Sequence, residues 1–201
     1  MTGNPLEAAR VKQHQSNAVE MVDRYWRQMA AGGQVPSRMK INPGDIQDAL
    51  EFAFVAEHIS GGIVRMRIAG GSIKAVMGME VAGMPAATLI APKERKAFNE
   101  TALHVLNTPS TAKLTLTAAA KYGQPGMEAE MRLYPLRGVT GGITQMLGTF
   151  VTTGSVGQTP RRFDVTSTEF EAVDASLPAK TRPILSRGHL SLVFLGKAGW
   201  F

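Results

Sequence analysis

The chain has 201 residues, a length typical of one domain with short appendages, and 44% of its residues are hydrophobic. It contains no cysteine, which excludes disulfides, thiolate nucleophiles and zinc–cysteine sites. The net charge is +6 at pH 7, but the excess of Lys and Arg lies in residues 1–40 and 154–201. No apolar run is long enough to cross a membrane and residues 1–10 lack a secretory signal, so we expect a cytoplasmic protein.

The N-terminal part divides into two stretches. Residues 1–14 are polar and lack periodicity, which predicts a disordered terminus. From Asn17 an apolar stripe recurs at helical spacing, and Asn17 followed by Glu20 resembles a capping pair, so we expect a helix over 15–33. The stripe either packs against the protein's own sheet or forms a dimer or partner surface, and its residues are Val19, Val22, Trp26 and Met29.

Two strands and three helices are predicted next. Asn42 and Pro43 begin a short helix, and residues 52–59 and 63–68 form a hairpin through Ser-Gly-Gly. Two glycines end the second strand, and Ser72 is then a good N-cap for a short helix. The most regular helix is expected over 92–107.

The second half of the chain is predicted to be β. Residues 113–119 and 128–133 alternate apolar with polar side chains, whereas 142–152 is apolar on both faces, as expected for a central strand. Residues 154–186 are rich in Gly, Ser, Thr and Pro, which predicts a linker or wrapping arm with a short helix at 167–173. The apolar run 190–195 is either a docked strand or a segment offered to another chain.

Three motifs carry a resemblance to a known family. They are RIAGG, where the second strand ends, YPL at 134–136, and RGHLSLV at 187–193. Together with the order of the predicted elements they resemble the PAS sensory family, in its small stand-alone bacterial variant, over about residues 26–152. The resemblance implies an α+β fold: a five-stranded antiparallel sheet with helices on one face. It divides the chain into a disordered terminus (1–14), an N-terminal helix (15–33), a PAS-like domain (34–153) and a C-terminal arm (154–201).

The resemblance also implies a function. PAS-like proteins are regulatory, so we expect a non-catalytic sensor or adaptor, a homodimer, that binds a small apolar ligand, a signalling protein, or both. Methionine-rich segments surround the place of the expected cavity, and thioethers suit either a ligand pocket or a plastic core. The candidate ligand-binding residues are Met77, Met84, Phe98, Leu116 and Met131.

The sequence offers few groups for other chemistry. The four histidines have no metal-ligand spacing, and His104 falls off the apolar stripe of its helix, so neither a metal site nor haem is expected. Without cysteine, cysteine–flavin photochemistry is excluded. Glu128 and Glu130 share a strand face that is expected to be wet, so we assign no catalytic residue. An alternative is a cone-shaped α+β enzyme of isomerase or hydratase type, which would need an ionisable residue on a buried strand face.

A basic regulator that binds nucleic acid is a further alternative. The densest basic clusters are Lys93, Arg95 and Lys96 at a helix start, and Arg161 with Arg162 nearer the C-terminus. Neither cluster is interleaved with stacking aromatic residues, so nucleic-acid binding is not expected. Strongly salt-dependent retention on DNA would distinguish this alternative.

Overall fold

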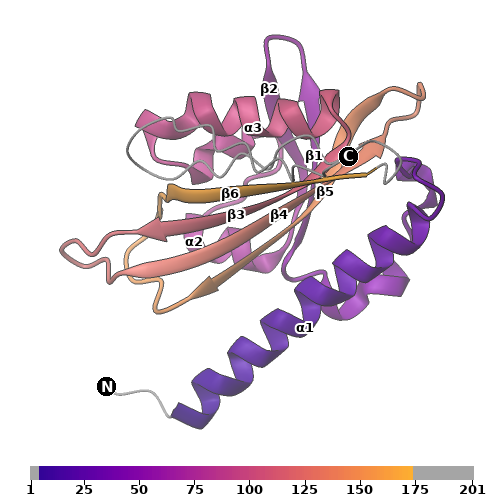
Figure 1. Cartoon of the computed structure of the whole chain (residues 1–201). Helices are drawn as coiled ribbons and strands as arrows, with labels where there is room; N and C mark the ends of the chain where they lie inside the picture. The colour runs from indigo at the N-terminus through magenta and orange to yellow at the C-terminus, as the bar shows by residue number, and fades with distance from the viewer. Residues whose placement is uncertain (1–4, 174–201) are drawn as a thin grey trace, which may run out of the picture.

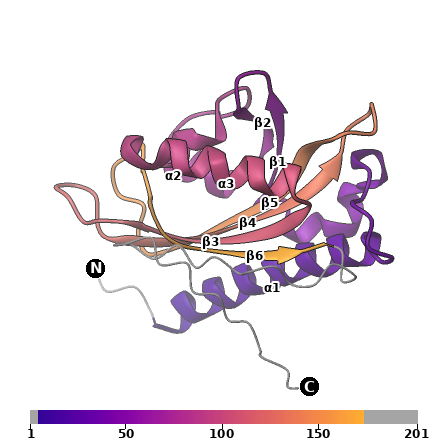
Figure 2. The same ribbon diagram turned by 45° about the horizontal axis from the view of Figure 1, so that its top comes forward.

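The computed structural model describes residues 5–173. Within them, one antiparallel sheet of six strands lies between helices on both sides (Figure 1, Figure 2). The strands follow the spatial order β2-β1-β5-β4-β3-β6. Their bounds are β1 (Ala53–Ile59), β2 (Ile63–Ala69), β3 (Ser110–Ala118), β4 (Met127–Arg137), β5 (Ile143–Thr153) and β6 (Asp164–Ala172).

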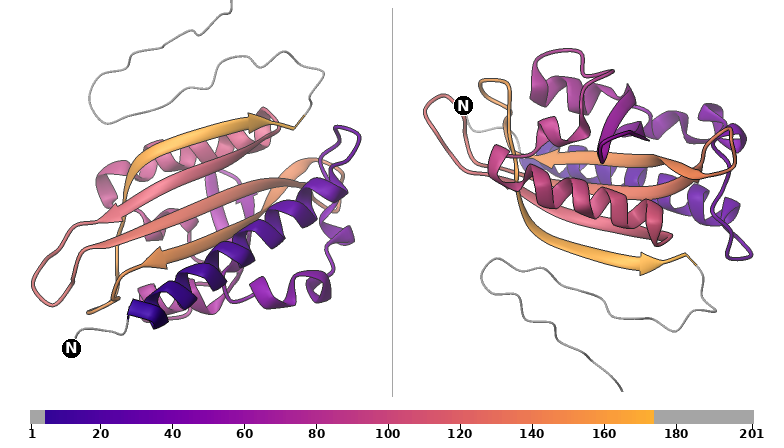
Figure 3. Two further views of the ribbon diagram at one scale, coloured as in Figure 1. Left: turned by 60° about the horizontal axis from the view of Figure 1, so that its bottom comes forward. Right: turned by 90° about the horizontal axis from the view of Figure 1, so that it is seen from above.

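The helices differ in length and in the face that they cover. Three are α-helices: α1 (Pro5–Met29), α2 (Gly71–Met77) and α3 (Arg95–Asn107). Four short 3₁₀ segments join them to the strands: η1 (Arg38–Lys40), η2 (Pro43–Ala49), η3 (Ala86–Leu89) and η4 (Pro92–Glu94). The helices α2 and α3 lie on one face of the sheet, which we call the inner face, and α1 crosses the outer face diagonally (Figure 3). None of the described helices is both long and apolar enough to span a membrane.

Each face of the sheet has its own hydrophobic core. The inner core joins α2, α3 and the inward side chains of the strands, and the outer core joins α1 and η2 to the outward side chains of β1, β4 and β5. The central strand β5 contributes to both, because Met146 and Phe150 point into the inner core while Leu147 points into the outer one. This confirms that 142–152 is a central strand covered on both sides.

The antiparallel α+β fold is confirmed, but the number of strands is wrong. The expected linker contains β6, and residues 167–173, expected to be a short helix, lie largely within it. Its sequence is rich in Thr and contains Val and Phe, which suit a strand, and it pairs antiparallel with β3 from Thr117 to Ser110. The strand forms because of that distant partner, which local periodicity does not reveal.

Two helix starts also differ from expectation. The helix α1 begins at Pro5, so residues 5–14, expected to be disordered, are helical, and Asn17 lies inside the helix instead of capping it. Residues 5–14 have no clear apolar stripe. They nevertheless contain residues with high helix propensity, and Glu7 lies in the first turn, where a negative charge stabilises a helix. The helix α2 begins after Gly70, and the hydroxyl of Ser72 donates instead to the carbonyl of Phe150, 2.8 Å away.

One glycine in the central strand tests the packing of the inner core. A Cβ atom at Gly148 would lie 2.2 Å from Cζ of the buried Phe54 ring, on the neighbouring strand. We expect Gly148→Ala to lower the free energy of unfolding by about 1–3 kcal/mol, since the ring has no room to move. In the control Gly142→Ala the new Cβ would have its nearest contact at 3.6 Å, so denaturant unfolding should be almost unchanged. Equal effects of the two changes would contradict the packing described.

Candidate functional site

The docking of α1 on the outer face of the sheet depends on Trp26. Its side chain is 2% exposed, and its indole Nε1 donates to the carbonyl oxygen of Pro135 at 3.0 Å. Its ring lies 5.6 Å from the ring of Tyr134, centroid to centroid. Val22, one turn earlier, is completely buried in the same core. A buried indole with its N–H satisfied fixes both the position and the rotation of the helix.

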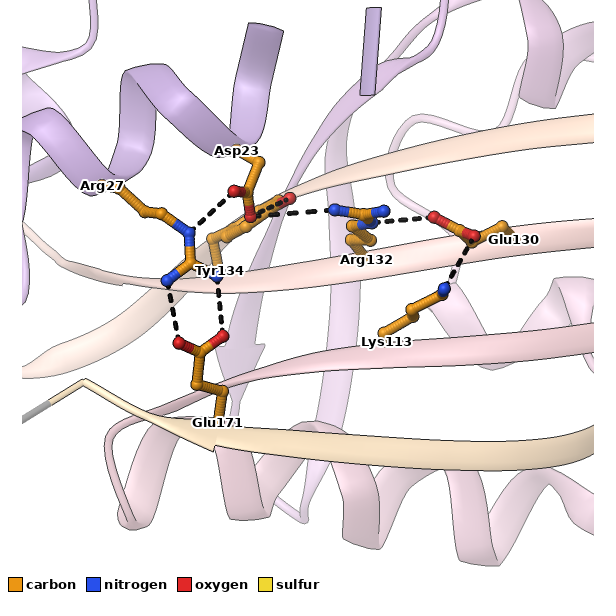
Figure 4. A network of polar contacts seen from close by, with 7 residues as sticks. All are labelled: Asp23, Arg27, Lys113, Glu130, Arg132, Tyr134 and Glu171. Atoms are coloured by element: carbon orange, nitrogen blue, oxygen red, sulfur yellow. Dashed lines mark hydrogen bonds and ion pairs between the residues drawn. The ribbon is translucent and has the colours of Figure 1, made fainter. Parts of the chain in front are cut away.

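Charged side chains continue this contact across the sheet (Figure 4). From α1, Arg27 Nε contacts Asp23 Oδ2 at 2.7 Å, and its two terminal nitrogens donate to the carboxylate of Glu171 on β6 at 3.0 and 2.7 Å. The hydroxyl of Tyr134 donates to Asp23 Oδ1 at 3.2 Å. The network therefore connects the first helix to the last described strand.

The same network extends along the outer face of β4 and β3. Arg132 Nη1 lies 3.8 Å from Asp23 Oδ1, and Arg132 Nε donates to Glu130 Oε1 at 2.7 Å. Lys113 Nζ on β3 lies 3.4 Å from Glu130 Oε2. Most of these side chains remain partly exposed, so each pair contributes little by itself, roughly 0–1 kcal/mol. Together they connect side chains of α1, β4, β3 and β6, and so they help to fix the position of α1 on the sheet.

Tyr134 has the most perturbed acidity of the network. Burial raises the pKa of its hydroxyl well above the usual value, and the negative charge of Asp23 raises that pKa further. The nearby Arg132 guanidinium opposes the effect but does not cancel it. The tyrosine is therefore neutral and acts as a hydrogen-bond donor throughout the physiological range.

A groove lies beside this network, between the first half of α1 and the outer face of the sheet. Its volume is about 290 Å³. Lysine, glutamine and serine side chains of α1 form one wall, and alternating side chains of β3, β4 and β5 form the other. The lining residues include Lys12, Gln15, Ser16, Val19 and Glu20 on α1, and Thr115, Glu128, Glu130, Arg132, Val151 and Thr153 on the strands.

The stripe expected to form a dimer or partner surface faces the protein's own sheet. Val19, Val22 and Trp26 are at most 3% exposed, and Met29 is half-buried. The alternative that the stripe packs on its own sheet is therefore the one observed within a single chain. While α1 stays docked these side chains are not accessible, and a role of the stripe in dimerisation stays a prediction.

The five residues expected to bind a ligand come together in the inner core, opposite the groove. Phe98 lies on α3 and Met77 at the end of α2, while Leu116 and Met131 point inward from β3 and β4, and all four are at most 2% exposed. Met84 is partly buried against the same cluster. The structure thus places all five residues in, or against, the core of the inner face. Whether a ligand binds among them stays a prediction.

Sequence reasoning did not find the polar network or the groove. The alternation of Glu128, Glu130 and Arg132 correctly indicated a polar strand face. The sequence pattern places Asp23 and Arg27 off the apolar stripe of the N-terminal helix, and Glu171 in the short helix expected within the linker. No local signal indicates that these groups meet, since Arg27 and Glu171 are 144 positions apart.

The described residues show no arrangement typical of catalysis. The buried inward side chains of the strands are apolar apart from Ser110 and Thr168. His104 is exposed on the flank of α3, as its spacing predicted, and its ring lies 4.6 Å from that of Phe170. Within residues 5–173 there is no group of three or more acidic or histidine side chains that could hold a metal ion.

Comparisons with known proteins give one informative match. A sequence model described as a PAS domain matches residues 13–151. No curated protein matches the chain. The structure of an RNA-binding Light-Oxygen-Voltage receptor has 20% sequence identity and a TM-score of 0.39, with 60% of this chain and 36% of that chain covered. The light-state structure of the blue-light photoreceptor Aureochrome1 LOV has 14% identity and a TM-score of 0.40, with 55% and 87% covered. The chain thus spans only 36% of the first of these structures, and both TM-scores are too low to support an argument.

Replacement of Trp26 tests the docking of α1. We expect Trp26→Ala to lower the free energy of unfolding by about 3–5 kcal/mol, because it removes a buried ring and leaves the carbonyl of Pro135 without its donor. Gln28→Ala, on the exposed side of the same helix, is the control and should change the stability little. Denaturant unfolding measures both, and native mass spectrometry reports the oligomeric state. A folded, equally stable Trp26→Ala protein would contradict the contact.

The raised pKa of Tyr134 predicts a pH dependence of stability. An unfolded tyrosine loses its proton near pH 10, whereas the folded protein retains it, so ionisation favours the unfolded state and stability should fall as the pH rises above about 10. Tyr134→Phe should reduce this fall, at a cost of about 1 kcal/mol at neutral pH for the lost hydrogen bond. Tyr122→Phe, at a side chain that is 99% exposed, is the control. Parallel pH profiles for all three proteins would contradict the assignment.

Proposed function

Because the chain belongs to the PAS domain family, we propose that it is a non-catalytic regulatory protein that binds a signalling protein through α1 and the outer face of its sheet. The observation that carries this proposal is the groove between the first half of α1 and strands β3 to β5. The second half of the helix is fixed by Trp26, whereas residues 6–14 are exposed. A helix anchored at one end and open at the other suits a contact with a second protein.

The chemistry of the groove indicates the kind of partner segment that fits. Glu128 and Glu130 on β4 give one wall an acidic stretch, and Lys12 on α1 and Arg132 on β4 add positive charge. Val11, on the exposed half of α1, is 52% exposed and adds apolar surface. A segment with side chains of both charges and some apolar surface would complement this groove, and such charge patterns favour specificity over raw affinity.

A regulatory role without catalysis is supported by the inner face. An enzyme of isomerase or hydratase type would need ionisable groups on the buried strand faces, and those of the described strands are apolar or carry a hydroxyl. Among the described residues, the one positively or negatively charged side chain that is fully buried is Arg161, which lies on a loop and donates to backbone carbonyls. The cytoplasmic location, the homodimer and the division into domain and arm stay predictions.

A small apolar or aromatic ligand in the inner core is a second candidate. It is favoured by the convergence of Met77, Met84, Phe98, Leu116 and Met131 between α3 and the sheet. Three of the five are methionines, and thioether side chains rearrange at small cost. A ligand could change the docking of α1 only through a different affinity for two states of the protein.

A groove variant tests partner binding. Proteins that co-purify with the wild-type chain would be identified. Each candidate partner would then be purified and titrated directly against the wild-type chain, a groove variant and a control variant. We expect Glu128→Lys to weaken binding by about tenfold or more, equivalent to about 1.4 kcal/mol, because it reverses a charge in the groove. Glu100→Lys, an exposed change on α3 across the sheet, is the control and should bind like the wild type. A search that yields no direct binder, or equal losses in both variants, would contradict the proposal.

The ligand hypothesis has its own test in Met131→Phe. If a ligand occupies the core, native mass spectrometry of freshly purified wild-type protein should detect the added mass, and the larger ring should abolish it. A wild-type mass equal to that of the chain, together with a loss of about 1–3 kcal/mol in the variant, would indicate an overpacked dry core and would exclude the ligand.

A further inference from the structure

Two basic segments that lie far apart in the sequence meet beside the inner core. The loop between β5 and β6 passes alongside the chain that leads into α3, and a parallel bridge joins Ile90 to Phe163. The amide of Ala91 donates to the carbonyl of Phe163 at 2.8 Å, and the amide of Phe163 donates to that of Leu89 at 2.9 Å. These bonds bring Arg162, the neighbour of Phe163, close to the start of α3.

Of the two arginines on this loop, Arg161 has a structural role. It is 1% exposed, and its guanidinium donates to the carbonyl oxygens of Pro125, at 2.6 Å, and Val156. Its backbone amide donates to the carbonyl of Val76 at 2.8 Å. The side chain thus holds the β3–β4 turn against the loop, and both of its terminal nitrogens donate to backbone carbonyls.

Arg162 and Arg95 differ from Arg161, because they are half-buried and do not use their guanidinium groups to hold the β3–β4 turn. Arg162 Nη1 contacts the sulfur of Met77 and the carbonyl of Arg161, each at 3.1 Å. Arg95 Nε donates to the carbonyl of Ile90 at 3.2 Å. Within residues 5–173 neither guanidinium forms an ion pair. Each retains N–H donors that could bind an anion.

The nearby acidic groups have other contacts. Asp164 forms an ion pair with Lys93 at 3.0 Å, and the carboxylate of Glu94 accepts from the amide of Val165 at 2.5 Å. Burial and the positive charge of Arg95 together lower the pKa of Arg162. Two guanidinium groups that repel each other and are partly withdrawn from water destabilise the protein unless something compensates them.

We propose that Arg95 and Arg162 form a subsite for an oxyanion, namely the carboxylate or phosphate group of a small molecule whose apolar part contacts Met77. The planar fork of a guanidinium matches both groups in a bidentate geometry, which makes Arg the preferred residue for such recognition. Met77 adjoins the inner core, so the subsite would bind the charged end of the ligand considered above. Only the apolar end of this ligand depends on the proposal that a small apolar molecule binds in the inner core. The groove proposed for the protein partner is lined by α1, and α1 lies on the opposite face of the sheet from α3 (Figure 2).

The observations favour a small anion over a nucleic acid. The patch contains two further cations, of which Lys93 is already paired with Asp164 and Lys96 is exposed. A backbone-tracking surface needs a longer row of cations with aromatic side chains for base stacking. The buried rings near this site, Phe163 and Phe98, belong to the inner core and are not accessible to bases.

Thermal unfolding of the full chain at constant ionic strength tests the subsite with three probes: inorganic phosphate, octanoate and octanol. We expect phosphate and octanoate to raise the melting temperature in a saturable way, and uncharged octanol not to do so. Arg95→Gln and Arg162→Gln should each weaken the apparent affinity by about tenfold or more. Lys121→Gln, in the exposed β3–β4 turn, is the control and should respond like the wild type. A larger effect of octanoate than of phosphate would identify an apolar carboxylate as the ligand class, and the reverse would identify a phosphate.

The variants without a probe separate a binding role from a structural one. If the arginines form a binding site, Arg162→Gln alone should melt at the same temperature or higher, because the repulsion from Arg95 is removed. A lower melting temperature with no change in phosphate response would make Arg162 a structural residue and would overturn the proposal. The absence of any saturable shift with either oxyanion would also overturn it, while leaving an apolar ligand and the partner groove untouched. The proposal would also be overturned if a single-stranded oligonucleotide bound more tightly than phosphate and its affinity fell with salt concentration as expected for the release of several counterions.

Discussion

Both faces of the central strand β5 carry large apolar side chains, and this requires the sheet to be covered on both sides. Met146 and Phe150 face α2 and α3, whereas Leu147 faces α1 and η2. Leaving Leu147 in water would forfeit roughly 1.5–3 kcal/mol. The N-terminal helix is therefore part of the fold, and its anchor is the indole of Trp26 with its bond to the carbonyl of Pro135.

The helix α1 covers only part of the outer face of the sheet, and the groove lies where the helix and the uncovered part meet. The second half of α1 packs on the outer core, and the helix crosses the sheet diagonally, so it does not cover all of this face (Figure 3). Polar side chains of β3 and β4 line the groove beside it. Apolar contacts thus fix the second half of the helix on the sheet. Weak ion pairs connect the same half to β4 and β6. Because the pair of Arg27 with Glu171 joins α1 to β6, a change in either element could reach the other. Each of these exposed ion pairs is weak, so the charged contacts add to the docking that the outer core provides and do not replace it.

The sixth strand and the loop before it extend the family fold at two places. On the outer face, β6 supplies Glu171 to the network with α1. On the inner side, the loop places the buried Arg161 against the β3–β4 turn and Arg162 beside the start of α3. The two arginines are adjacent in sequence and differ in function because alternate side chains of an extended segment point in opposite directions.

The sequence by itself determined the hairpin of β1 and β2, the helix α3, three further strands and the two-faced character of β5, because these follow from local periodicity and glycine positions. Through a resemblance to a family of known topology it also assigned Met77, Phe98, Leu116 and Met131 to the segments around the space between sheet and helices, and the structure buries them in the inner core. Only the tertiary structure decided that residues 164–172 form a strand, that Arg27 meets Glu171, and that Arg95 and Arg162 lie together. Each of these depends on partners more than 45 positions apart in the chain. The local sequence pattern around either partner does not indicate the contact. Side-chain periodicity reports which face of an element is buried, whereas the identity of what covers that face is decided only when the whole chain packs.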